Sequence, residues 1–340
     1  MNKLPLPMVT VVIPMFNVEK YIEKCIISVL EQTFQNFEVI CVDDGCSDNT
    51  LHILKQFTDP RIRLIKQQNR GLAGARNTGI QAAKGIYIAL LDSDDCWASQ
   101  KLTEHVAHLN SNPQVGVSYC PSLFIDEKGN MTGTGQFPKL TEIDFRDILC
   151  RNPVGNGSAP VIRRRLLADI STTSQEQNRK YYFDETLRQS EDIELWVRIA
   201  LSNKWKFEGI STPLTYYRIN GGGLSANLQK QFASWTLAMS KNQQTNTQLF
   251  NQLLPLARAY QLRYLARRAI HSRDSYQAIK LIHRALFEQP RILFEEPKRT
   301  IATYACALLS LLPRSLYNSL ESLAIKWMGQ RQSAVDIKEI

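Results

Sequence analysis

The sequence predicts an α/β protein built on a parallel, doubly wound sheet, with a helical extension at its C-terminal end. Short, mostly uninterrupted apolar runs recur in its first part, as is typical of strands buried on both faces. Segments with apolar residues at helical spacing lie between these runs. Strands that alternate with helices favour a parallel sheet, whose ligands bind beyond the carboxyl ends of the strands. With 340 residues, the chain is long enough for about two domains.

The elements of the sheet follow in order along the chain. Strands are expected over residues 9–14, 37–44, 62–67, 86–92 and 115–120. Helices are expected between them because apolar side chains recur there every three or four positions. These helices cover residues 21–30, the segment after Gly71 and the segment after Trp97.

The last third of the chain is expected to be helical and basic. Residues 228–340 contain 16 Lys and Arg against 7 Asp and Glu and so carry the whole net charge of +9. Two helices are predicted over residues 257–287, with a break near 272–275, and they resemble a single tetratricopeptide-like hairpin. Further apolar helices are predicted over 301–312 and 316–328. Such basic helices can face water, pack on their neighbours or lie in a lipid interface.

Cysteine usage and hydropathy indicate a location. Seven Cys, without a C-x-x-C pair, favour a reducing compartment over a disulfide framework. The N-terminal apolar run is too short for a signal peptide, and no apolar stretch reaches the roughly 20 residues of a membrane-spanning helix. We expect a cytoplasmic protein, with peripheral contact at the inner face of the membrane as an option.

Three carboxylates follow the fourth predicted strand directly: Asp92, Asp94 and Asp95. Like charges this close repel each other where water is partly excluded, so something must balance them. Asp92 and Asp94 project to the same side of an extended chain. Hard cations such as Mg²⁺ and Mn²⁺ favour carboxylate oxygens together with substrate phosphates. The alternative is a helix N-terminus, in which Asp95 or Ser99 caps the next helix.

Residues at the ends of other strands and helices exclude two kinds of phosphate-binding loop and add further acids. The first strand ends in PMFN rather than in a Gly-rich loop, so a dinucleotide fingerprint and a P-loop are both missing there. Acids gather at the end of the second strand, in DDGCSDNT, and in SEDIELW, where Glu191 and Asp192 begin a helix. The helix dipole alone can explain acids in a first helical turn.

Four segments together resemble the family-2 glycosyltransferases of the GT-A fold. They span about residues 9–227 and read VVIPMFNVEKYIEKCIISVLEQTFQNFEVICVDDGCSDNT, NRGLAGARNTGIQAAKGIYIALLDSDD, SEDIELWVRI and YYRINGGGLSAN. Cys46 departs from the family pattern, which usually has Ser or a similar small residue at that position. The resemblance implies a GT-A catalytic domain over residues 1–227, followed by a basic helical region over 228–340.

The resemblance implies how the diphosphate of a nucleotide-sugar donor is held. Asp94 would bind Mn²⁺ or Mg²⁺ as part of a D-x-D motif. Asp92 would lie near the donor ribose or a water on the metal, and it is a second candidate ligand. Arg218 would meet the diphosphate from a Gly-rich loop that closes over the donor, although a plain surface loop is the alternative.

The resemblance also implies a pocket for the nucleoside. Asp44 would accept a hydrogen bond from a uracil ring, with Pro14 and Phe16 shaping the pocket. An aromatic residue after a strand is more often part of the core, and Asp43 could instead hold the turn. Arg70 and Arg76 are donor-contact candidates by the same resemblance, and each could equally pair with a local acid.

On the acceptor side, the resemblance makes Asp192 the general base, and the helix dipole is expected to keep it ionised near neutral pH. Three further residues are expected to border the acceptor: Glu191, Gly155 and Asn156.

The expected activity is therefore that of a metal-dependent inverting glycosyltransferase of the hexosyltransferase type. It would use a nucleoside-diphosphate sugar, with UDP as the expected nucleotide, and a hydroxyl acceptor in a polysaccharide, glycolipid or glycoprotein glycan. A nucleic-acid partner is not expected. One alternative is a decayed, nucleotide-sugar-binding scaffold protein. A nucleotidyltransferase is the other, but it would bring a Gly-rich, basic phosphate loop near the N-terminus, which PMFNVEK is not.

Overall fold

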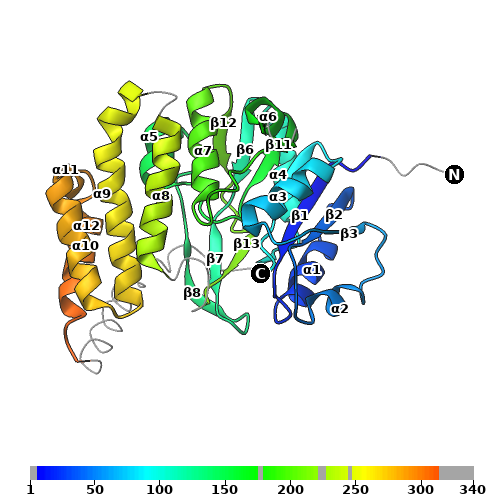
Figure 1. Cartoon of the computed structure of the whole chain (residues 1–340), viewed down its shortest axis with the longest axis horizontal. Helices are drawn as coiled ribbons and strands as arrows, with labels where there is room; N and C mark the ends of the chain where they lie inside the picture. The colour runs from blue at the N-terminus through cyan, green and yellow to red at the C-terminus, as the bar shows by residue number, and fades with distance from the viewer. Residues whose placement is uncertain (1–5, 175–178, 221–226, 244–246, 314–340) are drawn as a thin grey trace. The chain divides into compact units, whose positions relative to one another are not determined.

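A mostly parallel sheet organises the N-terminal part of the chain (Figure 1). The computed structural model describes residues 6–174, 179–220, 227–243 and 247–313. Within these residues, seven strands form one sheet in the order β12-β6-β9-β4-β1-β2-β3. Only β9 in this sheet runs against its neighbours, β4 and β6. The predicted α/β fold with a mostly parallel sheet is thus confirmed.

The strands of this sheet include all five that the sequence predicts. These five are β1 (Val9–Met15), β2 (Phe37–Asp43), β3 (Ile62–Lys66), β4 (Tyr87–Leu90) and β6 (Val115–Tyr119). Two short strands complete the sheet and were not predicted: β9 (Val161–Arg163) and β12 (Lys206–Gly209). Every residue of β1 and β2 is buried, which is why both read as continuous apolar runs.

Helices follow the strands as the periodicity predicts. The three predicted helices are α1 (Ile22–Leu30), α3 (Gly71–Ala82) and α4 (Lys101–Ser111). Further helices of this part of the chain are α2 (Thr50–Leu54), α5 (Phe145–Arg151), α6 (Arg164–Ile170) and α7 (Glu191–Ser202). α3 lies close against β1, since a Cβ on Gly79 would come within 2.3 Å of Val12 Cγ1.

A second, four-stranded sheet adjoins the end of β4. Its order is β5-β13-β7-β8, and its strands are β5 (Cys96–Trp97), β13 (Thr215–Arg218), β7 (Ser122–Ile125) and β8 (Met131–Gln136). β5 begins directly after the acidic run, so the run is a turn between two strands. A separate pair consists of β10 (Thr172–Ser174) and β11 (Arg179–Tyr181).

The chain divides into two compact units, the first ending at Phe250 and the second beginning at Asn251. The first unit includes α8 (Leu228–Gln243), which is tied to α7 by a hydrogen bond of 3.2 Å from Asn242 Nδ2 to Glu194 O. The compact unit therefore continues past residue 227, and the functional boundary predicted there stays a prediction.

The second unit is helical in its described part. Its helices are α9 (Thr247–His271), which begins just before the division, α10 (Ser275–Glu288), α11 (Arg291–Glu295) and α12 (Pro297–Leu309). The predicted break near residues 272–275 is confirmed, and the helix predicted over 301–312 corresponds to α12. The helix predicted over 316–328 lies outside the described residues. All seven cysteines of the chain are free thiols.

Candidate active site

Asp95 is the structural member of the acidic run. It is 1% exposed, and its carboxylate accepts hydrogen bonds from Ser158 Oγ (2.6 Å) and from the backbone N–H of Arg218 (2.8 Å). The helix-cap alternative for the run is wrong, because α4 has Gln100 at its N-cap and no side-chain capping hydrogen bond. Asp95 instead ties the turn to β13. Burial raises the pKa of Asp95 well above its ordinary range, and Asp94 and Asp92 add to the rise.

Asp92 and Asp94 lie at the carboxyl end of β4. Asp92 Oδ1 accepts a hydrogen bond from Arg76 Nη2 (2.6 Å), and Asp94 Oδ2 accepts one from Asn220 Nδ2 (3.1 Å). Burial, followed by the charge of Asp92, raises the pKa of Asp94 to about 6. The charged form of Asp94 is therefore disfavoured unless positive charge is added.

A buried arginine connects the two acidic motifs of the chain. Arg76, in α3, is 1% exposed and donates to Asp92 and, through Nη1, to Glu191 Oε1 (2.7 Å) at the start of α7. Burial acts to lower the pKa of Arg76, but Asp92 and Glu191 raise it overall, so the side chain stays charged. Gly157 leaves room for the pair, because a Cβ there would lie 2.2 Å from Arg76 Nη2 and 2.7 Å from Asp92 Oδ2.

Glu191 and Asp192 differ in their surroundings. Glu191 is 5% exposed, and burial raises its pKa to about 7 against the opposing charge of Arg76. Asp192 is half-buried, and one oxygen accepts the backbone N–H of Ile193 (2.8 Å). Burial also raises the pKa of Asp192, opposed by Arg76, so the lowering expected from the helix dipole alone does not prevail.

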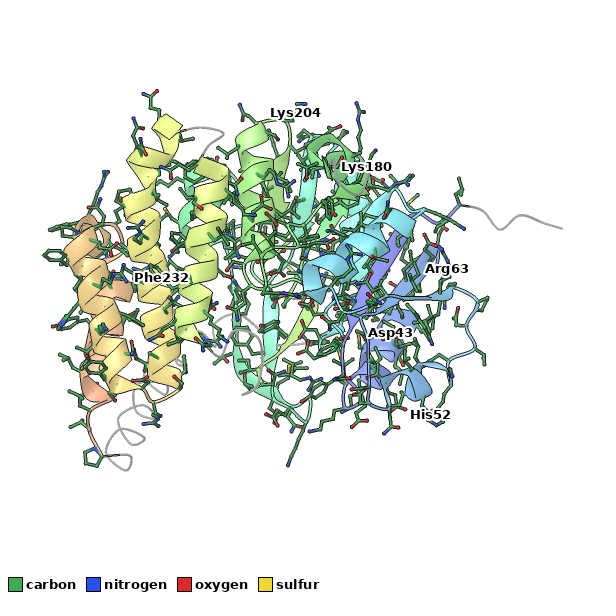
Figure 2. The ribbon with its side chains drawn as sticks, in the orientation of Figure 1. Asp43, His52, Arg63, Lys180, Lys204 and Phe232 are labelled. Carbon is green, nitrogen blue, oxygen red and sulfur yellow. The ribbon has the colours of Figure 1, made fainter. Side chains whose placement is uncertain are left out.

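The end of β2 contains a turn and a helix cap. Asp43 holds the turn, because its Oδ1 accepts the N–H groups of Gly45 (3.1 Å) and Cys46 (2.8 Å); Figure 2 labels this residue. Asp44 is 3% exposed and accepts three hydrogen bonds, from the N–H groups of Arg70 (2.8 Å) and Gly71 (2.8 Å) and from the side chain of Gln67 (2.6 Å). Asp44 thereby binds the N-terminal end of α3.

Two predicted pocket residues lie beside this turn, at the end of β1. Pro14 is buried within the strand, whereas Phe16, just after it, is 52% exposed. The alternative that Phe16 belongs to the core is therefore wrong. An exposed ring at the carboxyl end of a central strand is available to a ligand.

Arg70 pairs with an acid, which is one of the two arrangements open from the sequence. Its Nε lies 3.0 Å from Glu185 Oε2, and its Nη2 contacts Oε1 of the same carboxylate. Asn77 donates to Glu185 as well (2.9 Å). These contacts fix α3 to the segment that precedes α7.

Arg218 ends β13 and spans the acidic turn. Its Nε donates to Asp94 O (2.7 Å), its Nη1 donates to Asp126 O (2.6 Å), and its guanidinium lies 4.7 Å from the ring centre of Tyr21. The positive charge of Arg218 acts to lower the pKa of Asp94, although burial prevails. The glycines of the predicted closing loop, residues 221–223, lie outside the described residues.

The loop expected on the acceptor side joins the acidic turn to the second sheet. Asn156 Nδ2 donates to Ser122 Oγ of β7 (2.7 Å), and Gly155, with φ of 89°, packs against Gln136 of β8. Ser158, two residues on, donates to Asp95 and accepts the N–H of Asp92 (3.0 Å). Sequence reasoning missed Ser158, Glu185 and Asn220, because no local pattern links them to their charged partners Asp95, Arg70 and Asp94, each more than 60 positions away.

The carboxylate groups at the end of β4 are suitable ligands for a hard divalent cation. Two carboxylates, Asp92 and Asp94, stand at one strand end, and Mg²⁺ in particular is commonly held by one or two carboxylates together with substrate phosphates. The described residues contain no group of three or more His, Cys, Asp or Glu placed to hold a metal ion by themselves. With Asp92 and Asp94 as carboxylate ligands, substrate phosphates and water are the usual further ligands of such a cation.

No helix of the described chain is long and apolar enough to cross a bilayer.

The sequence pattern described as "Glycosyl transferase family 2" matches residues 10–171. Two Escherichia coli proteins, each named UDP-Glc:alpha-D-GlcNAc-diphosphoundecaprenol beta-1,3-glucosyltransferase, are similar over 225 residues, which cover 66% of this chain and 82% of each relative. They are WfaP, at 34% identity, and WfgD, at 30%.

Two solved structures share the fold. The crystal structure of S. aureus TarS 1-349 in complex with UDP-GlcNAc has a TM-score of 0.55 and 19% identity, covering 87% of this chain and 89% of that one. The mannosyltransferase PcManGT from Pyrobaculum calidifontis in complex with GDP-Man and Mn²⁺ has a TM-score of 0.56 and 20% identity, covering 90% and 86%. The sheet order, the acidic motifs joined by Arg76 and these similarities agree: the chain belongs to glycosyltransferase family 2 and has a GT-A-type fold.

Proposed function

We propose that the protein is a metal-dependent inverting glycosyltransferase that moves a sugar from a UDP-sugar to an acceptor hydroxyl. The observation that carries the proposal is the pair of contacts of Arg76, to Asp92 (2.6 Å) and to Glu191 (2.7 Å). These two contacts bring the end of β4 next to the start of α7. The acids at the end of β4 are suited to hold the cation of a diphosphate, and an acid at the start of α7 is suited to act as a general base. A displacement needs both groups at one site.

Asp192 is the proposed general base. Glu191 is buried and paired with Arg76, whereas Asp192 is half-buried, so Asp192 is the more accessible of the two to an acceptor. Its raised pKa makes it a stronger proton acceptor than an ordinary Asp while the carboxylate is ionised. Attack from the face opposite the leaving nucleoside diphosphate would invert the configuration of the transferred sugar.

Asp94 and Asp92 are the proposed ligands of Mn²⁺ or Mg²⁺. A cation held by these two carboxylates would supply positive charge for the diphosphate of the donor, where the leaving group gathers negative charge. Arg218 is proposed to add positive charge on the same side, since its guanidinium already lies beside the Asp94 backbone. These chain groups bind and orient the diphosphate.

The nucleoside is proposed to lie against Phe16 and Pro14, with Asp44 contacting the base. A carboxylate has about four lone-pair sites, and Asp44 accepts three hydrogen bonds from the protein, which leaves one for a base N–H. The two E. coli relatives are named for UDP-Glc and for an acceptor linked to diphosphoundecaprenol. Their names support a UDP-sugar donor and a glycan acceptor on a lipid diphosphate, with Gly155 and Asn156 on the acceptor side.

The test measures release of nucleoside diphosphate from each of a panel of nucleotide sugars, in the presence of Mn²⁺ and with a synthetic GlcNAc-diphosphate lipid as the acceptor. The anomeric configuration of the product is determined by NMR. Asp192→Asn should lower the turnover number by roughly 10²–10⁴-fold while donor binding persists. Asp274→Asn is the matched control, because Asn serves equally well at the N-cap of α10. Full activity of Asp192→Asn would refute the base assignment. Binding of donor without any turnover would favour the scaffold alternative.

A further inference from the structure

The outward side of α10 exposes aromatic and basic side chains in one line. Tyr276, Lys280, His283 and Phe287 recur at spacings of three or four residues and so share one face of the helix. Tyr276 is 72% exposed and Phe287 is 90% exposed. Aromatic rings grouped in water in this way mark an interaction surface more often than isolated surface residues do.

The outward side of α12 is apolar along its length. Its opposite side is buried and held by a hydrogen bond of 2.8 Å from Arg263 Nη1 of α9 to Thr300 Oγ1. Between Thr300 and Leu309 the helix has no charged residue. The exposed residues of this stretch are Ile301, Ala302, Ala305, Leu308 and Leu309.

The two outward sides adjoin. His283 Nε2 of α10 lies 2.8 Å from the hydroxyl of Tyr304 of α12, and the two ring centres are 5.4 Å apart. Both Lys298, at the start of α12, and Phe294, in the intervening α11, are exposed. We name this surface the α10–α12 face; its main residues are Tyr276, Lys280, Phe287, Lys298, Ile301 and Leu308.

The charge of this face is positive. All five Lys and Arg of residues 275–313 are exposed. The three Glu of the same stretch have side chains only 14–22% exposed, and each has an Arg partner. Acidic groups are therefore turned inward and basic groups outward in this described part of the second unit.

The positive charge of the α10–α12 face favours one of its three possible occupants, which are a second copy of the chain, residues 314–340 and a lipid bilayer. A second copy would present the same basic face, and like charges oppose such a contact. Residues 314–340 contain 4 Lys and Arg against 3 Asp and Glu, so they offer no acidic complement. An anionic bilayer has the opposite charge, and its interface accepts aromatic and aliphatic side chains while lysine stems extend their charged ends to the headgroups.

We propose that the α10–α12 face docks the protein on an anionic phospholipid bilayer. The inference does not depend on the proposed reaction, although it would bring the enzyme to any acceptor that is held in a membrane.

The test is co-sedimentation of the full chain with vesicles of phosphatidylcholine, alone or mixed with phosphatidylglycerol. Binding is expected only to the mixed vesicles and should weaken as salt is added. Phe287→Glu should lower the partition constant by about tenfold or more, and replacing Lys280 or Lys298 by Glu should lower it by at least roughly fivefold each. Phe137→Glu, at the residue just after β8, is the control, since Phe137 is also strongly exposed (61%) and the variant should bind like the wild type.

Failure of the full chain to bind the mixed vesicles, or unchanged binding of Phe287→Glu, would overturn the proposal. If the chain bound the mixed vesicles only after removal of residues 314–340, that segment and not the bilayer would be the occupant of the α10–α12 face. A dimer in sedimentation equilibrium that Phe287→Glu dissociates would assign it to a second copy. Nucleoside diphosphate release with a soluble acceptor should be the same for Phe287→Glu and the wild type, so failure here leaves the proposed reaction standing.

Discussion

Replacement of Arg76 by Met tests the central contact of the site. Methionine has a similar reach but no charge, so the change leaves Glu191 and Asp92 without their common cation. Removing one partner of a buried ion pair costs about 3–5 kcal/mol. Arg76 is 1% exposed and Glu191 is 5% exposed, so the full penalty is expected in the free energy of unfolding at pH 7.5.

The pH dependence of this loss has a definite sign. Arg76 acts to lower the pKa of Glu191, so its removal raises that pKa further above about 7. A carboxylate whose folded-state pKa lies above its unfolded value reduces stability at high pH and ceases to do so as it becomes protonated. The difference between variant and wild type should therefore shrink from pH 7.5 to pH 5.5, by no more than about 1 kcal/mol for this carboxylate, because wild-type Glu191 also becomes protonated below its pKa of about 7.

The assay is urea unfolding followed by tryptophan fluorescence, since Trp97 and Trp196 are buried in the same unit. Arg63→Met is the control: Arg63, labelled in Figure 2, pairs with Glu38 at 2.9 Å but its side chain is 40% exposed. Glu38 keeps its hydrogen bonds from Thr10 and Lys84, so the control should lose no more than about 1 kcal/mol. Equal small losses in both variants, without pH dependence, would refute the reasoning.

Three further predictions concern the same site. Ser158→Ala removes the donor to Asp95 and should reduce the free energy of unfolding by about 1–3 kcal/mol, whereas Ser202→Ala should change it little, because the Ser202 hydroxyl donates to Ile199 O of its own helix and otherwise accepts only a long contact from the Lys204 N–H (3.5 Å); equal losses in a urea titration would contradict it. Asp94→Asn should abolish manganese uptake in calorimetry with UDP present, while Asp59→Asn, remote in a surface pair with Arg61, should bind normally; retained uptake would remove Asp94 from the ligand set. Because the pKa of Asp192 is raised and a base must be ionised, the turnover number should fall as pH is lowered through that pKa, and a flat acid limb in the pH profile would argue against Asp192.

Most of the fold could be predicted from the sequence because the central strands are buried on both faces. β1, β2, β4 and β6 therefore appear as apolar runs, and helices such as α1 appear as amphipathic periods. β9, with three residues, is too short for such a signal, and its antiparallel direction depends on neighbours distant in sequence.

The sequence by itself determined the fold class, the acidic motifs and their positions at strand and helix ends. Whether a given side chain serves the fold or faces a ligand was decided only by tertiary structure: Asp95 binds Ser158, Arg70 binds Glu185, and Arg76 joins acids that are 99 positions apart. Periodicity is local and reports which face of an element is buried. The partner of a buried charge is chosen by chain segments that meet only after folding, so no local pattern can specify it.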